Sequence, residues 1–420
     1  MIYKYIANIC ITITNQTMQN IMIFTRSEET EQEQEQEQEQ DQDQEQTEKQ
    51  DPDAWYNKKP MKRLNYIGSK FQLLEWITSN ILEKTGWESL SGKRIADLFA
   101  GTGVVSNYFR NNQATTFSND AELYSSIITH AVSLSTYTNK CESLMFALNF
   151  EIDQEIHLYK KQESGITGFI TKHYSPYDDC ERMFFTQDNA IRIDYLRKRI
   201  EDERCNLNED EYAFMLASLI IAADAVSNVP AVYGCYLKNF KAKALKSLQI
   251  LPIHLLSIRP VQGSTVYQSD VLDDAFLEKI PKALDLVYLD PPYNARQYSK
   301  NYFPLNLIAM TPDQQAAEPP LKGKTGIPVS CFTSPFCQKK GVEPAFRKLV
   351  SKLNAEWVVL SYNSESLISK PKMIDLLQEF GTVSVVEQDY KRFKSFQYNN
   401  DKDIQEYLFI LHKTRVWRKM

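Results

Sequence analysis

The chain has 420 residues, enough for two or three domains, and its 43% apolar, 12% aromatic and 24% charged residues exclude a fibrous or wholly disordered protein. The net charge of −6 is unevenly distributed along the chain. Residues 1–60 carry 13 acidic and five basic side chains, whereas residues 61–420 carry 41 acidic and 43 basic ones. No run of about 18 apolar residues occurs, so no membrane-spanning helix is expected, and the slightly basic body is compatible with a nucleic-acid partner.

The seven cysteines show no Cys-x-x-Cys spacing and no accompanying histidine pair. A metal site is therefore not expected, and a disulfide framework is implausible in a chain of this length. Reduced thiols in a cytoplasmic protein are the expectation.

Residues 1–60 are predicted to form a disordered acidic tail. Glu and Gln alternate through residues 27–53 without an apolar face, so this segment cannot offset the entropy lost on folding. Globular patterning begins near Met61, which is also a candidate alternative start of translation.

Beyond the tail, strand and helix signals alternate. Apolar runs at 93–100 and 114–118 predict strands, and each is followed by a helical pattern, at 105–111 and 122–137. Residues 139–260 give mainly amphipathic helical patterns, which indicates an inserted domain. Further strands are predicted at 265–268, 284–289, 356–362, 382–388 and 405–413. This alternation predicts an α/β fold with a mainly parallel sheet, and the last two strands suggest an antiparallel hairpin.

The first motif with chemical meaning is Asp97-Leu-Phe-Ala-Gly-Thr-Gly103, where a strand runs into a glycine-rich turn before a helix. Glycines let backbone N–H groups approach a ligand, and a helix N-terminus favours a carboxylate or phosphate. Asp120 closes the next strand, where an acid can accept hydrogen bonds from both ribose hydroxyls of a nucleoside. This motif alone fits NAD, FAD or another adenosine ligand, and also a tight turn that binds nothing.

The second motif, Asp290-Pro-Pro-Tyr293, follows the apolar run 284–289. It therefore lies at the carboxyl end of a strand, where open α/β sheets bind ligands. A carboxylate and a rigid carbonyl at this spacing can each accept one N–H of a planar exocyclic amine, and the tyrosine ring can stack on the base that bears it.

Together these motifs resemble the Dam-like class of N6-adenine DNA methyltransferases, in the motif order that places the target-recognition domain between the cofactor and catalytic motifs. The resemblance also rests on Asn65-Tyr-Ile-Gly-Ser-Lys70, on Ser118-Asn-Asp120, on 290–302 and, more weakly, on Asp270. It implies a Rossmann-like S-adenosylmethionine-dependent methyltransferase sheet, with a catalytic domain at 61–138 and 261–420 and a helical recognition domain at 139–260. The implied catalytic residues are Asp290, Pro291, Pro292 and Tyr293, and the implied cofactor-binding residues are Tyr66, Gly68, Lys70, Asp97, Phe99, Gly101, Gly103, Asp120 and Asp270.

The resemblance implies transfer of a methyl group from S-adenosylmethionine to the N6 amine of an adenine flipped out of duplex DNA. It also implies the modification arm of a restriction–modification system, with a separately encoded endonuclease as a possible partner. Two stretches without acids supply candidate DNA contacts, since lysines there can bind phosphates. The candidates are Lys238, Lys241, Lys243, Lys322 and Lys324, together with Arg296 beside the catalytic loop.

Two alternatives stay open at this stage. RNA and protein-glutamine methyltransferases use a similar D/N-P-P-Y loop, but usually soon after the glycine loop, whereas 186 residues separate Gly103 from Asp290 here. A non-catalytic DNA-binding module would predict decay of one motif, and both are intact.

Overall fold

The computed structural model describes residues 64, 66–135, 138–161, 165–253, 261–390 and 404–414. The predicted acidic tail, Asn65 and the loop between the last two strands lie outside these residues.

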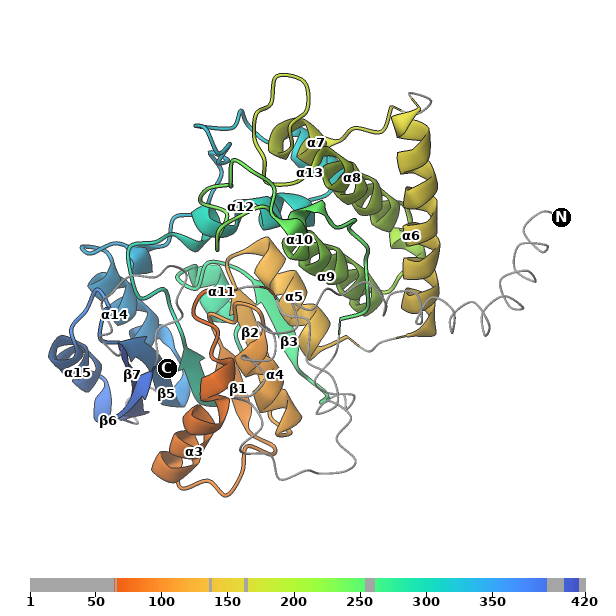
Figure 1. Ribbon diagram of the computed structural model, residues 1–420. Coiled ribbons are helices and arrows are strands. Elements are labelled where there is room, and N and C mark those ends of the chain that lie inside the picture. The colour runs from red at the N-terminus through yellow and green to blue at the C-terminus, as the bar shows by residue number, and fades with distance from the viewer. Residues whose placement is uncertain are drawn as a thin grey trace, which may run out of the picture. The chain divides into compact units, whose positions relative to one another are not determined.

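Seven strands form one sheet in the order β3-β2-β1-β4-β5-β7-β6 (Figure 1). The five strands β3, β2, β1, β4 and β5 run parallel to one another. Strand β7 is antiparallel to both of its neighbours, β5 and β6. The mainly parallel sheet and the C-terminal antiparallel hairpin predicted from the sequence are therefore confirmed. The strands are β1 Arg94–Asp97, β2 Thr115–Asp120, β3 Thr265–Gln268, β4 Leu284–Leu289, β5 Ala355–Asn363, β6 Gly381–Tyr390 and β7 Ile404–Lys413.

The strands have apolar side chains on both faces, as a sheet covered by two helical layers requires. Ile95 and Leu286 pack with the helices α3 and α4, whereas Ala96 and Val287 pack with α11, α14 and α15 on the opposite face. The helices are α3 Leu74–Thr85, α4 Val104–Asn111, α5 Leu123–Ser133, α6 Asn139–Lys160, α7 Phe169–Tyr174, α8 Gln187–Asp202, α9 Glu209–Ala225, α10 Ala242–Leu245, α11 Asp274–Lys279, α12 Tyr298–Ala309, α13 Pro312–Ala316, α14 Val342–Lys352 and α15 Lys370–Gln378.

Helices α6 to α10 occupy the segment predicted as an insertion and gather beside α5 and α12 (Figure 1). Their buried side chains share one apolar core with α5 and α12, which includes Ile128, Leu219 and Ile308. Helix α9 begins with a capping box between Asn208 and Glu211, which satisfies donors that a helix end otherwise leaves unpaired. The helical block therefore shares its core with α5 and α12, and α5 in turn contacts β2 and β3.

Helix α12 follows the catalytic loop and contains Pro304. Its backbone leaves helical geometry at Tyr302, where φ is −130°. Proline lacks the N–H that would bond to the preceding turn, so a kink is expected at this point. The kinked helix still buries both Tyr302 and Phe303.

The strand order reverses direction between β1 and β4, since the chain winds outward from β1 to β3 on one side and from β4 on the other. The carboxyl ends of these two neighbouring strands meet at the position where doubly wound sheets bind ligands. Both chemical motifs follow these strands. In the described part of the chain, no helix combines the length and apolar character needed to cross a membrane.

Candidate active site

The glycine loop between β1 and α4 is tightly built. Gly101 and Gly103 have φ values of +56° and +74°, a region that side chains other than glycine rarely adopt. A Cβ atom at Gly103 would lie 2.8 Å from Val132 and 2.9 Å from the backbone of Thr129, so α5 leaves no room for one. The close packing of this loop against α5 explains why the sequence requires glycine there.

Asp120 at the end of β2 closes the same loop. One carboxylate oxygen accepts a hydrogen bond from the Gly101 N–H at 2.8 Å, and the other accepts one from the Glu122 N–H at 2.9 Å. Burial raises the pKa of Asp120, while these N–H groups act in the opposite direction. The Ser125 hydroxyl and the Ala121 N–H also lower the pKa of Asp120 through hydrogen bonds.

Asp97 is a buried acid at the end of β1, and burial raises its pKa to about 7 against the hydrogen bond from Ser106. The Ser106 hydroxyl donates to one carboxylate oxygen at 2.6 Å. Within the described residues, the other oxygen has no hydrogen-bond partner. An unsatisfied buried oxygen beside the glycine loop is a feature that a bound ligand can explain.

Asp270 and Phe99 border the same loop. The Asp270 carboxylate accepts a hydrogen bond from the Leu272 N–H at 2.9 Å, in a turn that follows β3. The Asn119 amide ties this turn to the glycine loop, since it donates to the carbonyls of Leu98 and Ser269. The half-buried Phe99 ring packs edge-on against Phe336, with the centroids 5.1 Å apart.

Residues 66–70 lie over the glycine loop and are held there by α12. The Tyr66 ring is so close to Gly101 that a Cβ there would lie 3.0 Å from it. The ring stacks on Tyr302 at 5.2 Å. The Ile67 N–H donates to the Tyr302 hydroxyl at 2.9 Å, and the Tyr298 hydroxyl donates to the Ile67 carbonyl at 3.1 Å. These contacts fix the chain path that leads to Lys70.

Lys70 carries this segment to the catalytic loop. Its ammonium lies 3.1 Å from the Asp290 carboxylate, donates to the Gly68 carbonyl at 3.0 Å and faces the Tyr293 ring at 4.7 Å. Gly68 has a φ of +84°, which lets the chain turn sharply before the lysine. The sequence analysis assigned Lys70 to the cofactor site, whereas in the structure its ammonium forms an ion pair with Asp290.

The predicted catalytic loop, Asp290 to Tyr293, follows β4. The Tyr293 hydroxyl donates to the second Asp290 oxygen at 2.7 Å and lies 3.0 Å from the Ser361 hydroxyl. Burial raises the pKa of Asp290, and Lys70 opposes that effect. Each carboxylate oxygen of Asp290 therefore has a protein donor, Lys70 for one and Tyr293 for the other. The predicted stacking face of Tyr293 lies beside Tyr362 and Lys70.

Two residues of this site, Ser361 and Glu406, were not predicted from the sequence. They lie on β5 and β7, within the predicted strands 356–362 and 405–413. Gln297 exchanges two hydrogen bonds with the backbone of Ser334, at 2.8 and 3.1 Å, and so braces the catalytic loop. An isolated polar residue at the end of an apolar strand is the signal that could have indicated Ser361 and Glu406.

The candidate DNA contacts fall on separate elements. Lys238, Lys322, Lys324 and Arg296 are exposed, whereas Lys241 and Lys243 are half-buried beside the end of α9. The Lys243 ammonium lies 3.5 Å from the Asp224 carbonyl.

Lys322 and Lys324 stand on a tight turn. Residues Lys322 and Ile327 pair through two backbone hydrogen bonds of 2.9 Å. Arg182 donates to the carbonyls of Gly323 and Lys324, and the buried Tyr174 hydroxyl donates to the Gly326 carbonyl at 2.6 Å. The turn is therefore fixed on the helical block, although Arg182 lies 142 residues from Lys324 in sequence.

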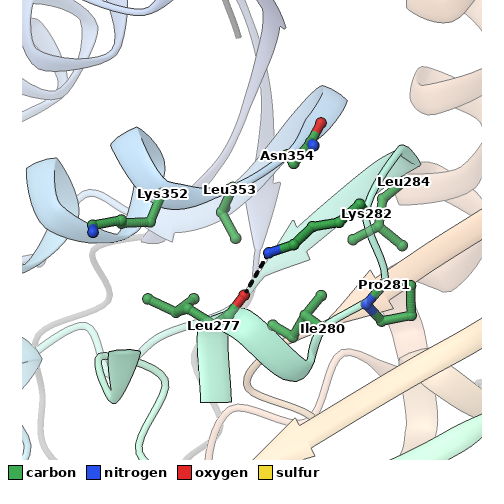
Figure 2. Close-up of a pocket in the computed structure, with 8 residues that line it drawn as sticks. All are labelled: Leu277, Ile280, Pro281, Lys282, Leu284, Lys352, Leu353 and Asn354. Atoms are coloured by element: carbon green, nitrogen blue, oxygen red, sulfur yellow. Dashed lines mark hydrogen bonds between the residues drawn. The ribbon is translucent and has the colours of Figure 1, made fainter. Parts of the chain in front are cut away.

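A small hollow lies at the opposite edge of the sheet, where β4 and β5 begin (Figure 2). Leu277, Ile280 and Leu353 line it with apolar groups, and the Lys282 ammonium donates to the Leu277 carbonyl at 3.2 Å. It lies away from the carboxyl ends of the strands and has none of the chemistry described above. The described residues also contain no group of three or more metal-ligating side chains.

Comparison with known proteins agrees with this geometry. The family model for D12 class N6 adenine-specific DNA methyltransferases matches residues 66–376. The type II methyltransferase M.CviAII of Paramecium bursaria Chlorella virus 1 is 38% identical, over 84% of this chain and 99% of its own length. M.NlaIII of Neisseria lactamica is 37% identical over 84% of this chain and all of its own length, and M.FokI of Planomicrobium okeanokoites is 33% identical over 83% and 53%.

The matched region spans the glycine loop, the helical block and the catalytic loop. It decides between DNA and the alternative RNA or protein substrates that the Asp-Pro-Pro-Tyr loop left open. The chain belongs to the family of D12 class N6 adenine-specific DNA methyltransferases, and it is an enzyme that methylates adenine in DNA.

Proposed function

We propose that this enzyme transfers the methyl group of S-adenosylmethionine to the N6 amine of an adenine flipped out of duplex DNA, at one short sequence. The observation that carries the proposal is the position of Asp290, which follows β4 at the switch point of the sheet beside the glycine loop of β1. Its relatives are type II methyltransferases, which supports a role as the modification enzyme of a restriction–modification system with a separately encoded endonuclease.

The residues around the glycine loop suit S-adenosylmethionine. We assign Asp120 to the ribose hydroxyls, and Tyr66 covers the loop. The Asp97 oxygen that has no hydrogen-bond partner within the described residues would accept a hydrogen bond from the cofactor. Gly68, Phe99, Gly101, Gly103 and Asp270 complete the proposed cofactor site. When bound, S-adenosylmethionine supplies a methyl group already activated by its sulfonium.

Asp290 and the Pro291 carbonyl would accept the two N–H groups of the adenine amine. That amine is a weak nucleophile, because its lone pair is delocalised into the ring. Acceptors aimed at its N–H groups raise the electron density on nitrogen as it becomes tetrahedral in the transition state. Pro292 keeps the loop rigid, and the ring of Tyr293 offers a stacking surface to the flipped base. No metal or nucleophilic side chain is needed for this reaction.

DNA binding is assigned to three groups of basic residues. Lys322 and Lys324 project from the turn held by Arg182, and Arg296 follows the catalytic loop. Phosphate contacts from such side chains give affinity and orientation without reading the sequence. The third group consists of Lys238, Lys241 and Lys243, which follow α9.

Expression of the full chain in a bacterial host without DNA methylation, followed by modification-sensitive long-read sequencing, tests this proposal. N6-methyladenine at a single short motif is expected, and an Asp290→Ala variant expressed to the same level should leave the genome unmodified. Soluble protein that binds S-adenosylmethionine but leaves the host DNA unmodified would contradict the proposal. Protection of the same motif from an endonuclease that cleaves it would support the restriction–modification role.

A further inference from the structure

Glu406 is a buried acid on β7 that the proposed reaction does not use. Only 5% of its surface is exposed, and within the described residues its Oε2 atom has no hydrogen-bond partner. Buried carboxylates normally have a donor for each oxygen, because desolvation of an unpaired charge is costly. The vacant oxygen calls for a donor in some state of the enzyme.

The pairing of the strands brings Glu406 to the catalytic tyrosine. Glu406 is the direct antiparallel partner of Asn363, and Ser361 lies two residues before Asn363 on the same face of β5. The Ser361 hydroxyl is 3.0 Å from the Tyr293 hydroxyl. Glu406 therefore shares a face of the sheet with the hydroxyl group that donates to Asp290.

The surrounding charges agree with this placement. Burial raises the pKa of Glu406, Lys70 lowers it and Asp290 raises it. Asn363 and the Tyr293 hydroxyl also stabilise its ionised form. Lys70 thus faces two acids, and its ammonium is already bonded to Asp290 and to the Gly68 carbonyl.

The Tyr293 hydroxyl and the adenine amine are both donors to Asp290, and this competition indicates when Glu406 accepts a hydrogen bond. The Tyr293 hydroxyl has a single hydrogen, which it donates to Asp290 at 2.7 Å. The adenine amine also needs an acceptor at Asp290, so the two donors compete for this carboxylate, and turning the tyrosine hydrogen away leaves both lone pairs of that oxygen to the amine. Of the two other acceptors near it, Ser361 is a neutral hydroxyl, and Glu406 is a carboxyl group whose Oε2 atom has no hydrogen-bond partner within the described residues. Hydrogen bonds to ionised acceptors are the stronger ones.

We propose that Glu406 is a positioning residue that accepts the hydrogen bond of the Tyr293 hydroxyl when the target adenine binds to Asp290. This inference rests on the proposed function. No proton changes owner, because the hydroxyl turns from one carboxylate to the other. Glu406 acts through Tyr293 and leaves the Asp290 carboxylate free for the amine.

A double-mutant cycle with Tyr293→Phe tests the inference, since phenylalanine keeps the ring and removes the hydroxyl. The probe is unmethylated bacteriophage λ DNA with tritiated S-adenosylmethionine, and the readout is the single-turnover rate. In the enzyme with Tyr293, Glu406→Leu is expected to lower the rate about ten-fold, as for loss of a hydrogen bond to a charged group. In the Tyr293→Phe enzyme, Glu406→Leu should change the single-turnover rate less than about two-fold, because no tyrosine hydroxyl is present to donate a hydrogen bond to Glu406.

The other outcomes each overturn the inference. An equal loss in both backgrounds would mean that Glu406 only supports the fold, and no loss with Tyr293 present would mean that it is not used. A Tyr293→Phe enzyme without activity would show that the hydroxyl has a different task. Failure of the unsubstituted enzyme to methylate DNA would instead contradict the proposed function.

Two further variants keep the test decisive. Glu406→Gln retains an acceptor oxygen at nearly the same volume, so it should lose less activity than Glu406→Leu and can replace it if the leucine variant does not fold. Glu387→Leu removes a carboxylate from the neighbouring strand β6, where it pairs with Lys370 on the surface. It should methylate DNA at the unsubstituted rate.

Discussion

Asp290 is the proposed acceptor for the adenine amine, and both Lys70 and the Tyr293 hydroxyl contact its carboxylate. The two contacts orient the carboxylate and offset part of the cost of burying it. In the proposed reaction, Lys70 would keep the carboxylate in this orientation for the adenine amine after the Tyr293 hydroxyl has turned away. Such preorganisation is the main way in which an active site without a strong base lowers a barrier.

We predict that Asp290→Ala lowers the rate of methyl transfer by at least about 100-fold, because the acceptor for the amine is lost. DNA affinity should stay within about two-fold, since the phosphate contacts lie elsewhere. Tritium transfer and gel-shift titration measure the two quantities. The exposed acid Asp274, at the start of α11, provides the control substitution Asp274→Ala. Substantial methyl transfer by Asp290→Ala would exclude the mechanism.

Glu122 shows how burial at this site couples stability to pH. It is 6% exposed, the Asn306 amide donates to it, and burial raises its pKa to about 7 in spite of that hydrogen bond. The folded state therefore holds a proton that the unfolded chain releases near pH 4.5. The stability due to this protonation is complete below about pH 4.5 and is lost as the pH rises through about 7.

We accordingly predict that Glu122→Gln raises the free energy of unfolding at pH 8 by about 1–3 kcal/mol, because glutamine keeps the acceptor without the charge. At pH 4.5 the two proteins should differ little. Thermal unfolding at both pH values, without added cofactor, measures the difference, with the exposed Glu278→Gln as control. An equal shift at both pH values would refute the titration of Glu122.

At the scale of elements, strand positions were predictable from the sequence, because a short apolar run bounded by turn residues is enough to indicate a strand. The runs at 265–268 and 284–289 match β3 and β4 in both limits. The two motifs could also be placed, since both follow such strands. The contacts of Lys70 with Asp290 and of Glu406 with its neighbours were not predictable, because they depend on strand order and register between segments far apart in the chain.

The turn at 322–327 is a further element whose place depends on tertiary contacts. Arg182 reaches three carbonyls, of Gly323, Lys324 and His173, with the fork of its guanidinium. A Cβ at Gly326 would lie 2.8 Å from this guanidinium, so the turn fits closely against it. Arg182 therefore fixes the backbone of the turn that carries the exposed Lys322 and Lys324.

We predict that Arg182→Ala raises the KM for DNA about three- to ten-fold and leaves the affinity for S-adenosylmethionine unchanged, because only the lysines of the turn lose their position. Arg182→Lys should behave almost as Arg182→Ala, since one ammonium cannot span the three carbonyls. Arg199→Ala on α8, which removes the arginine that pairs with Glu151 of α6, is the control. An unchanged KM for DNA would remove the turn from the DNA interface.

At the scale of the molecule, the helical block shares buried surface with two helices of the catalytic part. Helices α5 and α12 belong to the catalytic half by sequence, yet their apolar side chains complete the core of α6, α8 and α9. α12 also carries Tyr298 and Tyr302, which hold the segment above the glycine loop. The division at residues 138 and 261 stays a prediction from sequence, and this continuous core joins the two parts it would separate.

The shared core predicts one cooperative unfolding transition that includes both the helical block and the cofactor site. Leu219→Ala on α9, at a fully buried position, should cost about 2–5 kcal/mol and lower the midpoint of that whole transition. Added S-adenosylmethionine should raise the midpoint of the same transition in both proteins, because a ligand stabilises every element that unfolds with its site. Scanning calorimetry with and without the cofactor measures both effects. Two separate transitions, of which the cofactor shifts one and Leu219→Ala the other, would show instead that the helical block folds independently of the sheet.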